Sequence, residues 1–522
     1  MVELEYTPCD AIPSIVHELQ HSFNVGLTRD LSFRKKQLQN LMRFCDEQKS
    51  AMQDAMYADL HKHRIESEVA EIALVYEECK YMLSNLDRLA KPTPTKKRFQ
   101  MNRFDKTYVR KEPKGVVTVI GAWNYPINLL LVPLVGAIAA GCCVAIKPSE
   151  VAVNTACMLT KELPKYLDKR AYTIVNGGPA ETTVLLEQKL GHIFYTGNGT
   201  VGKIIMTAAA KTLTPVTLEL GGKSPAFVAP DADFELTARR LLWGKLYNAG
   251  QTCVAPDYVM VSKDHQERFV TVLRKVVREF YTDDPQKSNS YGRIINTRQF
   301  DRLKAILDAC DPKTIVTGGN TDREDLYIAP TIFKDVTNDS PLMKDELFGP
   351  ILPVLPVKDM DEAIDIVNSR YVYIKQRSRE HLFNMDSHSD HPLALYVFTN
   401  SSTTYNHILD HCISGGVLVN DTLMHLAETS LPFGGVGDSG MGNYHGEKSF
   451  DVFTHHRATM VKSTQFDSLL ATRYPPYTAD KEYLMNVLVY GLPSSIGGKI
   501  KTVFKACSTA YRVFFRRQQT IA

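Results

Sequence analysis

Gly115-Val116-Val117-Thr118-Val119-Ile120 is a continuous apolar run of the kind that lies buried on both faces of a parallel sheet. Further short apolar runs follow at residues 143–146, 171–175 and 192–195, with helix-like sequence between them. Strands that alternate with helices indicate βαβ units and a doubly wound sheet. The sequence therefore predicts an α/β fold.

The segments around these runs have patterns of their own. Residues 31–89 show the spacing of apolar side chains that is typical of helices. Residues 91–98 contain two prolines and a run of charges, which predicts a connector. The apolar stretch 127–140 has only 14 residues, which is too short to span a bilayer, so we expect a core helix there.

The composition is that of an ordinary globular protein, with 44% hydrophobic and 23% charged residues. A length of 522 residues suggests about two to four domains. The 61 basic residues nearly balance the 58 acidic ones, for a net charge of +3, which argues against a nucleic-acid partner. There are ten cysteines without a CxxC pair, and the N-terminus lacks the features of a secretory signal, so we expect reduced thiols in the cytoplasm.

A glycine-rich segment follows the 192–195 run. Gly197-Asn198-Gly199-Thr200-Val201-Gly202 matches the GxGxxG fingerprint, and a strand, turn and helix in this order place backbone amides where they bind a phosphate. In the standard fingerprint an acidic residue about 20 positions further on binds a ribose. Glu219 lies 17 positions past Gly202, but the residues that surround it point to a different role.

Two segments at and after Glu219 are the most specific in the chain. They are Thr217-Leu218-Glu219-Leu220-Gly221-Gly222-Lys223-Ser224-Pro225 and, about thirty residues later, Asn248-Ala249-Gly250-Gln251-Thr252-Cys253. On these residues the sequence resembles the aldehyde dehydrogenase superfamily, and it looks most like the class 3 branch, which contains the fatty aldehyde dehydrogenases. Further matches, in the family's order, are Trp123-Asn124-Tyr125-Pro126, Lys147-Pro148-Ser149-Glu150, Glu346-Leu347-Phe348-Gly349-Pro350 and Leu431-Pro432-Phe433-Gly434-Gly435-Val436-Gly437. The resemblance runs from about residue 30 to residue 465.

The resemblance implies a Rossmann-like cofactor-binding domain, an α/β catalytic domain and a short β element for oligomerisation. We expect N-terminal helices and the dinucleotide-binding domain in residues 1–219, and the catalytic domain in residues 220–430. Residues 431–465 would complete the site and the dimer interface, and residues 466–522 would form a basic amphipathic tail. A homodimer is the usual assembly of the family.

Cys253 is the expected nucleophile. Oxidation of an aldehyde by hydride transfer requires a tetrahedral carbon, and a thiolate both adds to a carbonyl and leaves well from a thioester. At pH 7 a free thiol with a pKa near 8.5 is only about 3% thiolate, so the site has to assist it. Cys142, Cys143 and Cys157 lie in apolar surroundings and fit the ordinary role of a small buried side chain.

Two further residues complete the expected catalytic set. By resemblance, Glu219 is the general base that deprotonates the water for thioester hydrolysis. Gly221 and Gly222 beside it permit a close approach of the backbone. The oxyanion donors are, by resemblance, the side-chain amide of Asn124 and the backbone N–H of Cys253. An enzyme that transfers the acyl group to CoA or phosphate needs no such base, so Glu219 favours hydrolysis.

The cofactor implied by the resemblance is NAD. Lys147 and Glu150 would bind the adenosine ribose, and a carboxylate there favours free hydroxyls over a 2′-phosphate. NADP stays the less favoured alternative, because Lys147 can partly offset the charge of a phosphate. Residues 197–202 would pack against the pyrophosphate, and Glu346 and Phe348 would position the nicotinamide ribose and ring. We expect no metal centre.

The predicted function is therefore NAD-dependent oxidation of medium- to long-chain aliphatic aldehydes to carboxylic acids. Two alternatives stay open: a short-chain or aromatic aldehyde dehydrogenase of the same branch, and a non-catalytic scaffold that retains the fold. A scaffold is expected to have lost site residues, whereas Cys253, Glu219 and Asn124 are all present.

Two regions depart from the family pattern, and the first is an insertion. Residues 371–390, which are polar and rich in His, Arg and Ser, separate two segments that the family joins almost directly. The insertion is either a surface loop or a mistranslated intron. We favour the intron, because loops of this length without structure are uncommon inside compact domains.

The second departure is the C-terminal tail, in which residues 491–522 contain six basic residues and no acids. Lysines interrupt its apolar residues, so a membrane-spanning helix is not expected. A helix would place Ile496, Ile500, Val503, Phe504, Cys507, Tyr511 and Phe514 on one side, opposite Lys501, Lys505, Ser508 and Arg512. This pattern is typical of a segment in a bilayer interface, and we expect contact with the cytosolic face of an internal membrane. The alternative is that the apolar stripe packs on the enzyme body or on the dimer partner.

Overall fold

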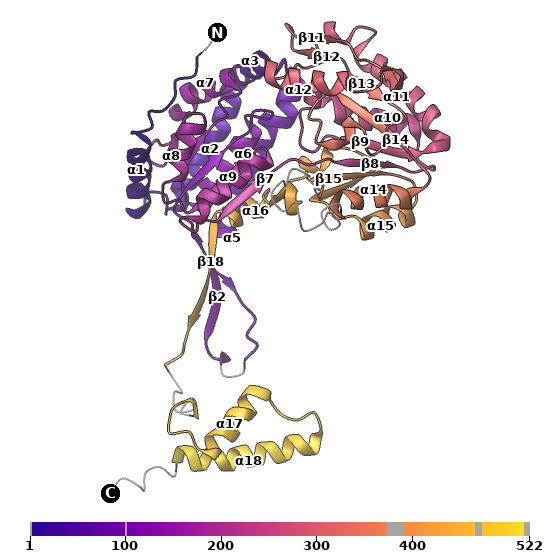
Figure 1. Ribbon diagram of the computed structural model, residues 1–522. Coiled ribbons are helices and arrows are strands. Elements are labelled where there is room, and N and C mark those ends of the chain that lie inside the picture. Colours follow the sequence, from indigo (N-terminus) through magenta and orange to yellow (C-terminus); the bar gives the residue numbers. More distant parts are fainter. Residues whose placement is uncertain (1–2, 100–101, 373–390, 465–471, 516–522) are drawn as a thin grey trace, which may run out of the picture. The chain divides into compact units, whose positions relative to one another are not determined.

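The computed structural model describes residues 3–99, 102–372, 391–464 and 472–515 (Figure 1). The question of whether residues 371–390 are a loop or an intron falls outside the described residues, except for the helix end at 371 and 372. The chain forms two compact units. The main unit contains Met1–Leu89 and Pro113–Thr454, and the tail unit contains Ala90–Glu112 and His455–Ala522.

The first sheet of the main unit contains the strands predicted from the apolar runs. Its six strands lie in the order β17-β7-β6-β3-β4-β5, and all neighbours are parallel except β17, which is antiparallel to β7. The bounds are Val116–Ile120 (β3), Cys143–Lys147 (β4), Tyr172–Ile174 (β5), His192–Thr196 (β6), Val216–Glu219 (β7) and Gly440–Met441 (β17). β3, β4 and β6 are buried along their whole length, as expected for a sheet covered on both faces. The predicted α/β fold is confirmed.

The second sheet of the main unit has seven strands in the order β10-β13-β14-β9-β8-β15-β16. The bounds are Pro225–Val228 (β8), Tyr258–Ser262 (β9), Ile315–Thr317 (β10), Thr331–Phe333 (β13), Ile351–Val357 (β14), Ala394–Phe398 (β15) and Gly416–Val419 (β16). A separate pair is formed by Thr321–Asp322 (β11) and Tyr327–Ile328 (β12). The change from one sheet to the other falls between β7 and β8, close to the expected boundary at residue 219. The boundaries at 219 and 430 stay predictions.

Helices cover the sheets of the main unit, and α6 and α9 contact strands of the first sheet (Figure 1). The longer helices are Ile12–Asn24 (α1), Leu31–Glu47 (α2), Lys49–Leu60 (α3), Ala73–Ala90 (α5), Asn128–Ala140 (α6), Val153–Glu162 (α7), Pro179–Leu186 (α8), Gly199–Ala210 (α9), Phe234–Leu246 (α10), Gln266–Tyr281 (α11), Thr297–Asp308 (α12), Met360–Val372 (α14) and Ser402–His411 (α15). The short ones are Arg64–Ser67 (α4), Pro341–Lys344 (α13) and Glu447–Val452 (α16). Every residue of α6 from Leu129 to Ala140 is buried, so the predicted core helix is confirmed.

The tail unit begins with a three-stranded sheet in the order β1-β2-β18. Its strands are Thr93–Pro94 (β1), Lys106–Pro113 (β2) and Thr454–Val461 (β18). The prediction that residues 91–98 form only a connector is therefore wrong for two residues, because Thr93 pairs with Val109. A proline is tolerated in β1 because this strand lies at the edge of the sheet.

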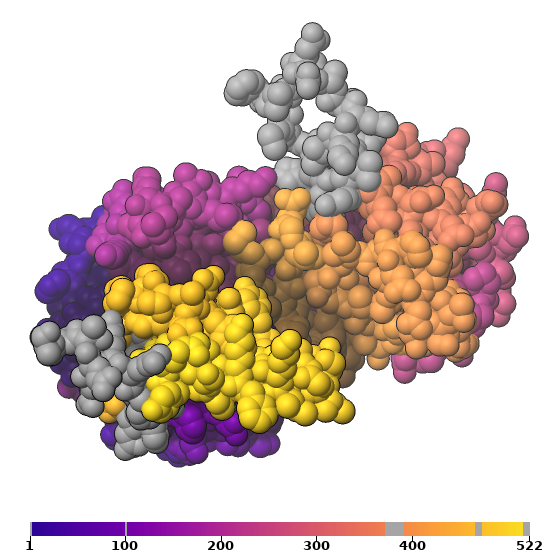
Figure 2. Space-filling model, turned by 90° about the horizontal axis from the view of Figure 1, so that it is seen from below, coloured from indigo at the N-terminus to yellow at the C-terminus, as the bar shows by residue number. Residues whose placement is uncertain are grey.

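Two helices complete the tail unit, α17 (Ala479–Tyr490) and α18 (Ile496–Phe515), and they pack together as a continuous yellow body in the space-filling view (Figure 2). Two cationic side chains of α18 contact α17. Arg512 donates two hydrogen bonds to Asp480, at 2.8 and 2.9 Å, and the Lys505 ammonium lies 4.4 Å from the ring centre of Tyr483. The predicted apolar stripe is largely exposed, including Ile496 and Phe504.

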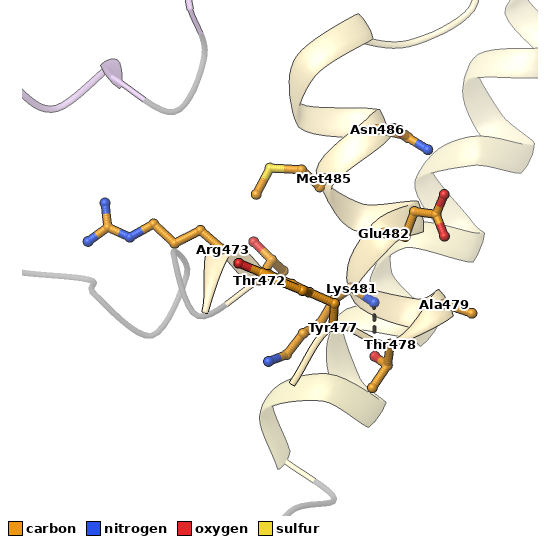
Figure 3. A pocket seen from close by; sticks show the side chains of 9 residues that line it. All are labelled: Thr472, Arg473, Tyr477, Thr478, Ala479, Lys481, Glu482, Met485 and Asn486. Carbon is orange, nitrogen blue, oxygen red and sulfur yellow. Dashed lines mark hydrogen bonds between the residues drawn. The ribbon is translucent and has the colours of Figure 1, made fainter. Parts of the chain in front are cut away.

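A hollow of about 520 Å³ opens beside α17 (Figure 3). Its described lining residues are Thr472, Arg473, Tyr477, Thr478, Ala479, Lys481, Glu482, Met485 and Asn486, and none of them is an expected catalytic or cofactor residue. The Lys481 ammonium donates to the Tyr474 carbonyl at 2.7 Å. Within the described residues, the helices are too short or too polar to cross a membrane.

Candidate active site

Glu219 is the last residue of β7, and backbone contacts on both sides fix its place. Gly440 of β17 pairs with Glu219, and the main-chain carbonyl of Glu219 accepts a hydrogen bond from the Gly197 N–H at 3.0 Å. The side chain is only 2% exposed, and neither carboxyl oxygen has a hydrogen-bond partner among the described residues. Burial raises the pKa of this carboxyl well above its usual range. An unpaired buried carboxyl is costly, so it calls for a functional explanation.

The loop before Cys253 has an unusual backbone. Asn248, Ala249 and Gly250 follow one another with φ of 54°, 51° and 75°, in the left-handed region that side chains other than glycine rarely adopt. A Cβ at Gly250 would collide with the carbonyl of Gly349. Such a conformation persists only where its surroundings hold it, and it is common at functional sites.

Gln251 ties this loop to the rest of the main unit. Its side-chain amide donates to the carbonyls of Asn248, at 3.1 Å, and Arg293, at 2.9 Å. Its Oε1 accepts from the Ile295 N–H at 3.0 Å. Because all of these contacts come from one side chain two positions before Cys253, they fix where the thiol lies.

Cys253 is partly exposed, whereas the residues on either side of it are buried. Desolvation of the thiol, followed by the charges of Glu346 and Glu219, raises the pKa of Cys253 to about 12. Burial, and then the charges of Glu219 and Cys253, raises the pKa of the Tyr444 phenol. The structure therefore brings Cys253, Glu219 and Glu346 together, with Tyr444 beside them. Nothing in the sequence pattern singled out Tyr444.

Asn124 lies in the turn after β3 and is buried. Its side-chain Nδ2 donates to the Gln251 carbonyl at 3.0 Å, which places the amide next to the Cys253 loop. The main-chain carbonyl of Asn124 accepts from Asn248 Nδ2 at 2.9 Å and from the Lys62 ammonium at 2.8 Å. A side-chain amide has two N–H groups, so a second donor remains for a ligand.

Lys62 and Glu71 form a fully buried ion pair that sequence reasoning missed. Glu71 also accepts from the N–H groups of Ile127, at 2.9 Å, and Asn128, at 3.1 Å, at the start of α6. The Lys62 ammonium lies 4.1 Å from the ring centre of Tyr125. These bonds hold the turn that contains Asn124 from both ends. A lysine and a glutamate in helical sequence give no local sign of such a role.

The segment with Glu346 and Phe348 also lies near Cys253, since the Glu346 charge acts on the thiol and Gly349 meets Gly250 of the Cys253 loop. Gly221 leaves room for the Glu346 carboxyl, which a Cβ at that position would exclude. Burial, then the charge of Asp257, raises the pKa of Glu346 to about 8. Phe348 has a φ of 50°, and its ring meets the Trp123 ring edge-on with 5.3 Å between centres.

Asp257 holds this segment in place. Its carboxylate accepts from the Lys223 ammonium at 2.6 Å and from the Leu347 N–H at 3.2 Å, and Lys223 also donates to the Asp345 carbonyl at 3.0 Å. Lys223 and Asp257 are both buried, so these charge-assisted bonds are strong. The sequence motif contained Lys223 but did not indicate its partner.

The expected cofactor residues lie at the ends of β4 and β6. The Lys147 ammonium donates to Glu150 at 3.0 Å, and the Asn198 side chain caps α9 by accepting from the Val201 N–H at 3.0 Å. A Cβ at Gly199 would meet no heavy atom within 4 Å, so the start of α9 is open on this side. An open helix N-terminus suits a phosphate, and an amine beside a carboxylate suits ribose hydroxyls. These residues therefore fit a nicotinamide dinucleotide.

Known proteins share both this sequence and this fold. The profile of the aldehyde dehydrogenase family matches residues 16–459. The chain is 47% identical to aldehyde dehydrogenase family 3 member B1 of Homo sapiens, over 90% of this chain and 95% of the relative. It is 44% identical to the dimeric NADP-preferring aldehyde dehydrogenase of Mus musculus, over 90% and 98%. The substrate-bound AldH of Staphylococcus aureus matches with a TM-score of 0.84 and 38% identity, over 91% of this chain and 98% of that one.

These matches confirm the resemblance to the class 3 branch and the fold that it implied. The family couples oxidation to NAD or NADP, which agrees with the fit of the residues at β4 and α9. The chain belongs to the aldehyde dehydrogenase family, and it is an aldehyde dehydrogenase oxidoreductase.

Proposed function

We propose that this enzyme oxidises medium- to long-chain aliphatic aldehydes with NAD, through a thiohemiacetal and then a thioester on Cys253. The observation that supports the cycle most is the Glu219 carboxyl, which is buried beside Cys253 with both oxygens unpartnered among the described residues. A base that must accept a proton from an incoming water needs such free oxygens.

The first step is addition. The Cys253 sulfur attacks the carbonyl carbon, and the thiol proton leaves to a base or to water. The oxygen of the aldehyde becomes an oxyanion, which the free N–H of the Asn124 amide and the backbone N–H of Cys253 stabilise. The other N–H of this amide donates to the Gln251 carbonyl, and Lys62 and Asn248 hold the main-chain carbonyl of Asn124, so the donor is oriented before the substrate arrives.

Lys147 and Glu150 would hold the adenosine ribose, the start of α9 would hold the pyrophosphate, and Glu346 and Phe348 would position the nicotinamide end. When bound, the oxidised nicotinamide would supply the acceptor for the hydride that leaves the thiohemiacetal carbon. The Glu150 carboxylate would repel a 2′-phosphate, which supports NAD over NADP. The ratio of kcat/KM for NAD and NADP tests this preference, and a ratio below one would overturn it.

The last step is hydrolysis of the thioester. Glu219 takes a proton from water, the hydroxide adds to the acyl carbon, and the Cys253 thiolate leaves with the carboxylic acid as product. Burial raises the pKa of the Glu219 carboxyl, which makes its ionised form a stronger base for the proton of this water. Neither oxygen of its carboxyl has a hydrogen-bond partner among the described residues, so none of them competes with the water.

The substrate class rests on the family branch and on the tail. NADH formation across an aldehyde series from two to sixteen carbons, with benzaldehyde as the aromatic comparison, tests it directly. We expect kcat/KM to rise with chain length, whereas a maximum at short or aromatic aldehydes would support that alternative. No NADH from any of these aldehydes, with Cys253→Ala equal to the wild type, would indicate a scaffold.

We also propose that the tail binds the cytosolic face of an internal membrane, and that the cytoplasmic enzyme is a homodimer. The exposed apolar stripe of α18, with Ile496 78% and Phe504 75% exposed, supports the membrane contact. Fractionation of cells that express the full chain or residues 1–490 tests it, and an equal membrane fraction for the two would overturn it. Sedimentation of the purified enzyme tests the dimer.

A further inference from the structure

The first residues of the chain form an N-terminal strap, residues 3–11, that precedes α1. The Thr7 N–H donates to the Asn176 carbonyl and the Thr7 hydroxyl accepts from the Asn176 N–H, both at 3.0 Å. Near the start of the strap, the Glu3 carbonyl contacts the Cys157 thiol of α7 at 3.6 Å. In Figure 1 the strap is the indigo segment that runs from the N-terminus past α7 to α1. The family profile begins at residue 16, so it assigns no role to the strap.

The strap places the ring of Tyr6 against Gly178. The ring carbon Cε2 and the phenol oxygen lie 3.7 and 3.8 Å from the position that a Cβ at Gly178 would take. The Glu181 carboxylate lies beside the same point and accepts from the Gly178 N–H at 2.8 Å. Burial, and then the charges of Glu150 and Glu181, raises the pKa of the Tyr6 phenol. The phenol therefore lies near the Glu181 carboxylate and within reach of the charge of Glu150, which belongs to the Lys147–Glu150 pair.

These contacts cluster where a parallel sheet binds its ligand. β4 ends at Lys147 and the neighbouring β5 ends at Ile174, so the residues that follow both strands lie at the carboxyl edge of the sheet. Open α/β sheets bind their ligands outside this edge. Tyr6 is 46% exposed, so part of its ring is free to touch a ligand at this place.

We propose that Tyr6 is a specificity-determining residue of the dinucleotide site, whose ring contacts the adenosine half and favours a free ribose over a 2′-phosphorylated one. The proposal rests on the proposed role of Lys147 and Glu150 in binding the adenosine ribose. It adds a residue from outside the family's matched region to that site.

Two physical effects produce this preference. An aromatic ring offers an apolar face to a nucleoside, and such contacts strengthen binding of any base. A 2′-phosphate, by contrast, would enter a space that the Tyr6 ring narrows and that Glu150 and Glu181 make negative. The Lys147 ammonium is already paired with Glu150 at 3.0 Å. Removal of the ring would therefore weaken an unphosphorylated nucleotide but give a 2′-phosphate more room.

Calorimetric titration of the full chain with 5′-AMP and with 2′,5′-ADP tests the proposal without any turnover. For Tyr6→Ala we expect 5′-AMP to bind at least about fivefold more weakly, as for loss of an aromatic contact to a base. Binding of 2′,5′-ADP should change little, so the preference between the two probes falls. Tyr6→Phe, which keeps the ring, should retain the wild-type preference.

The matched control is Tyr57→Ala, a tyrosine of α3 that is similarly exposed, at 52%. It should bind both probes as the wild type does, and all variants should keep the wild-type thermal midpoint. Unchanged binding of both probes to Tyr6→Ala, or a Tyr6→Phe variant that behaves like Tyr6→Ala, would overturn the proposal.

The same titrations separate this proposal from the proposed cofactor site. If Glu150→Gln shifts the preference between the probes and Tyr6→Ala does not, the cofactor site stands and the role of Tyr6 is wrong. If the wild type binds neither probe, both are wrong. A shift with Tyr6→Ala and with Glu150→Gln supports both.

Discussion

Two buried glutamates of the main unit show opposite ways of placing a charge inside a protein. Glu71 is paired with Lys62 and accepts two backbone N–H groups, so its oxygens are satisfied. Glu219, at the end of β7, has no hydrogen-bond partner among the described residues for either oxygen. A buried carboxylate with hydrogen-bond partners holds the segments around it in place. A buried carboxyl without such partners can exchange a proton with a reactant. We therefore expect changes in the Glu71 region to affect stability, and changes in the Glu219 region to affect turnover.

The largest expected effect is the loss of catalysis when the nucleophile is removed. Cys253→Ala removes the proposed nucleophile, and we expect kcat/KM to fall by at least about 10⁴-fold. Cys310→Ala is the matched control. The hydrogen bond described for the Cys310 thiol goes to the Ile306 carbonyl of its own helix end, at 3.2 Å, and not to a predicted site residue. NADH formation with a long-chain aldehyde measures both variants. Activity that survives in Cys253→Ala would remove the basis for the proposed cycle.

Glu219→Gln tests the unsatisfied member of the pair. Loss of a general base lowers kcat by about 10²–10⁴-fold. Stability should hold or increase, because a neutral amide is easier to bury than an ionisable group without partners. Steady-state kinetics and thermal unfolding together measure the variant. A large loss of stability with a normal kcat would contradict the difference that we draw between Glu219 and Glu71.

Asn124→Ala removes the proposed oxyanion donor. We expect kcat to fall by about 10²–10³-fold, as for other single oxyanion donors. KM should change less, because the donor acts mainly on the charge that develops in the transition state. Asn128→Ala is a control at a neighbouring position, since its amide donates to the Ala70 carbonyl and not to the Cys253 loop. Equal effects of the two changes would argue against a specific role.

Lys62→Met tests the satisfied member of the pair. It leaves Glu71 buried without its cation, and we expect a loss of about 3–5 kcal/mol in the free energy of unfolding. We expect kcat to fall by only about tenfold, because Asn124 keeps its bond from Asn248. Adding Glu71→Gln to Lys62→Met should restore part of the stability. Urea unfolding measures both, and a double variant less stable than Lys62→Met would contradict the pairing.

The smallest expected effect is on the pH profile. Burial holds the pKa of Glu219 well above its usual range, and the pKa of Cys253 is raised to about 12. Both groups act in their ionised forms, so the active fraction increases as the pH rises toward these values. We expect kcat to increase between about pH 6 and pH 9, and Glu219→Gln to lose part of this rise. A kcat that decreases over this range would contradict the assignment.

Local sequence predicted the parts of the structure that local patterns determine. The apolar runs became β3, β4, β5 and β6, and the stretch 127–140 became the buried helix α6, because burial on all sides leaves a continuous apolar signal. The motif predicted Cys253, Glu219 and Asn124 as site residues. The Glu219 charge acts on the Cys253 thiol and the Asn124 amide bonds the loop that contains Cys253, whereas their catalytic roles stay predictions.

Contacts between distant segments could not be predicted in this way. Lys62 and Asn124 are 62 positions apart, and neither residue shows in its surroundings that the two will bond. In α18 the pattern predicted two faces, but not that Arg512 would pair with Asp480 of α17. Asp480 lies in another helix, and helical periodicity describes one helix at a time.

The most direct test of the account is single-turnover analysis of Glu219→Gln with a saturating aldehyde. If Cys253 adds to the substrate and Glu219 serves hydrolysis, one equivalent of NADH should form per site. An acyl group should then remain on Cys253, where intact-mass and peptide analysis can locate it. The account would be contradicted by a variant that forms no NADH in the first turnover, or one whose acyl group is released as fast as in the wild type.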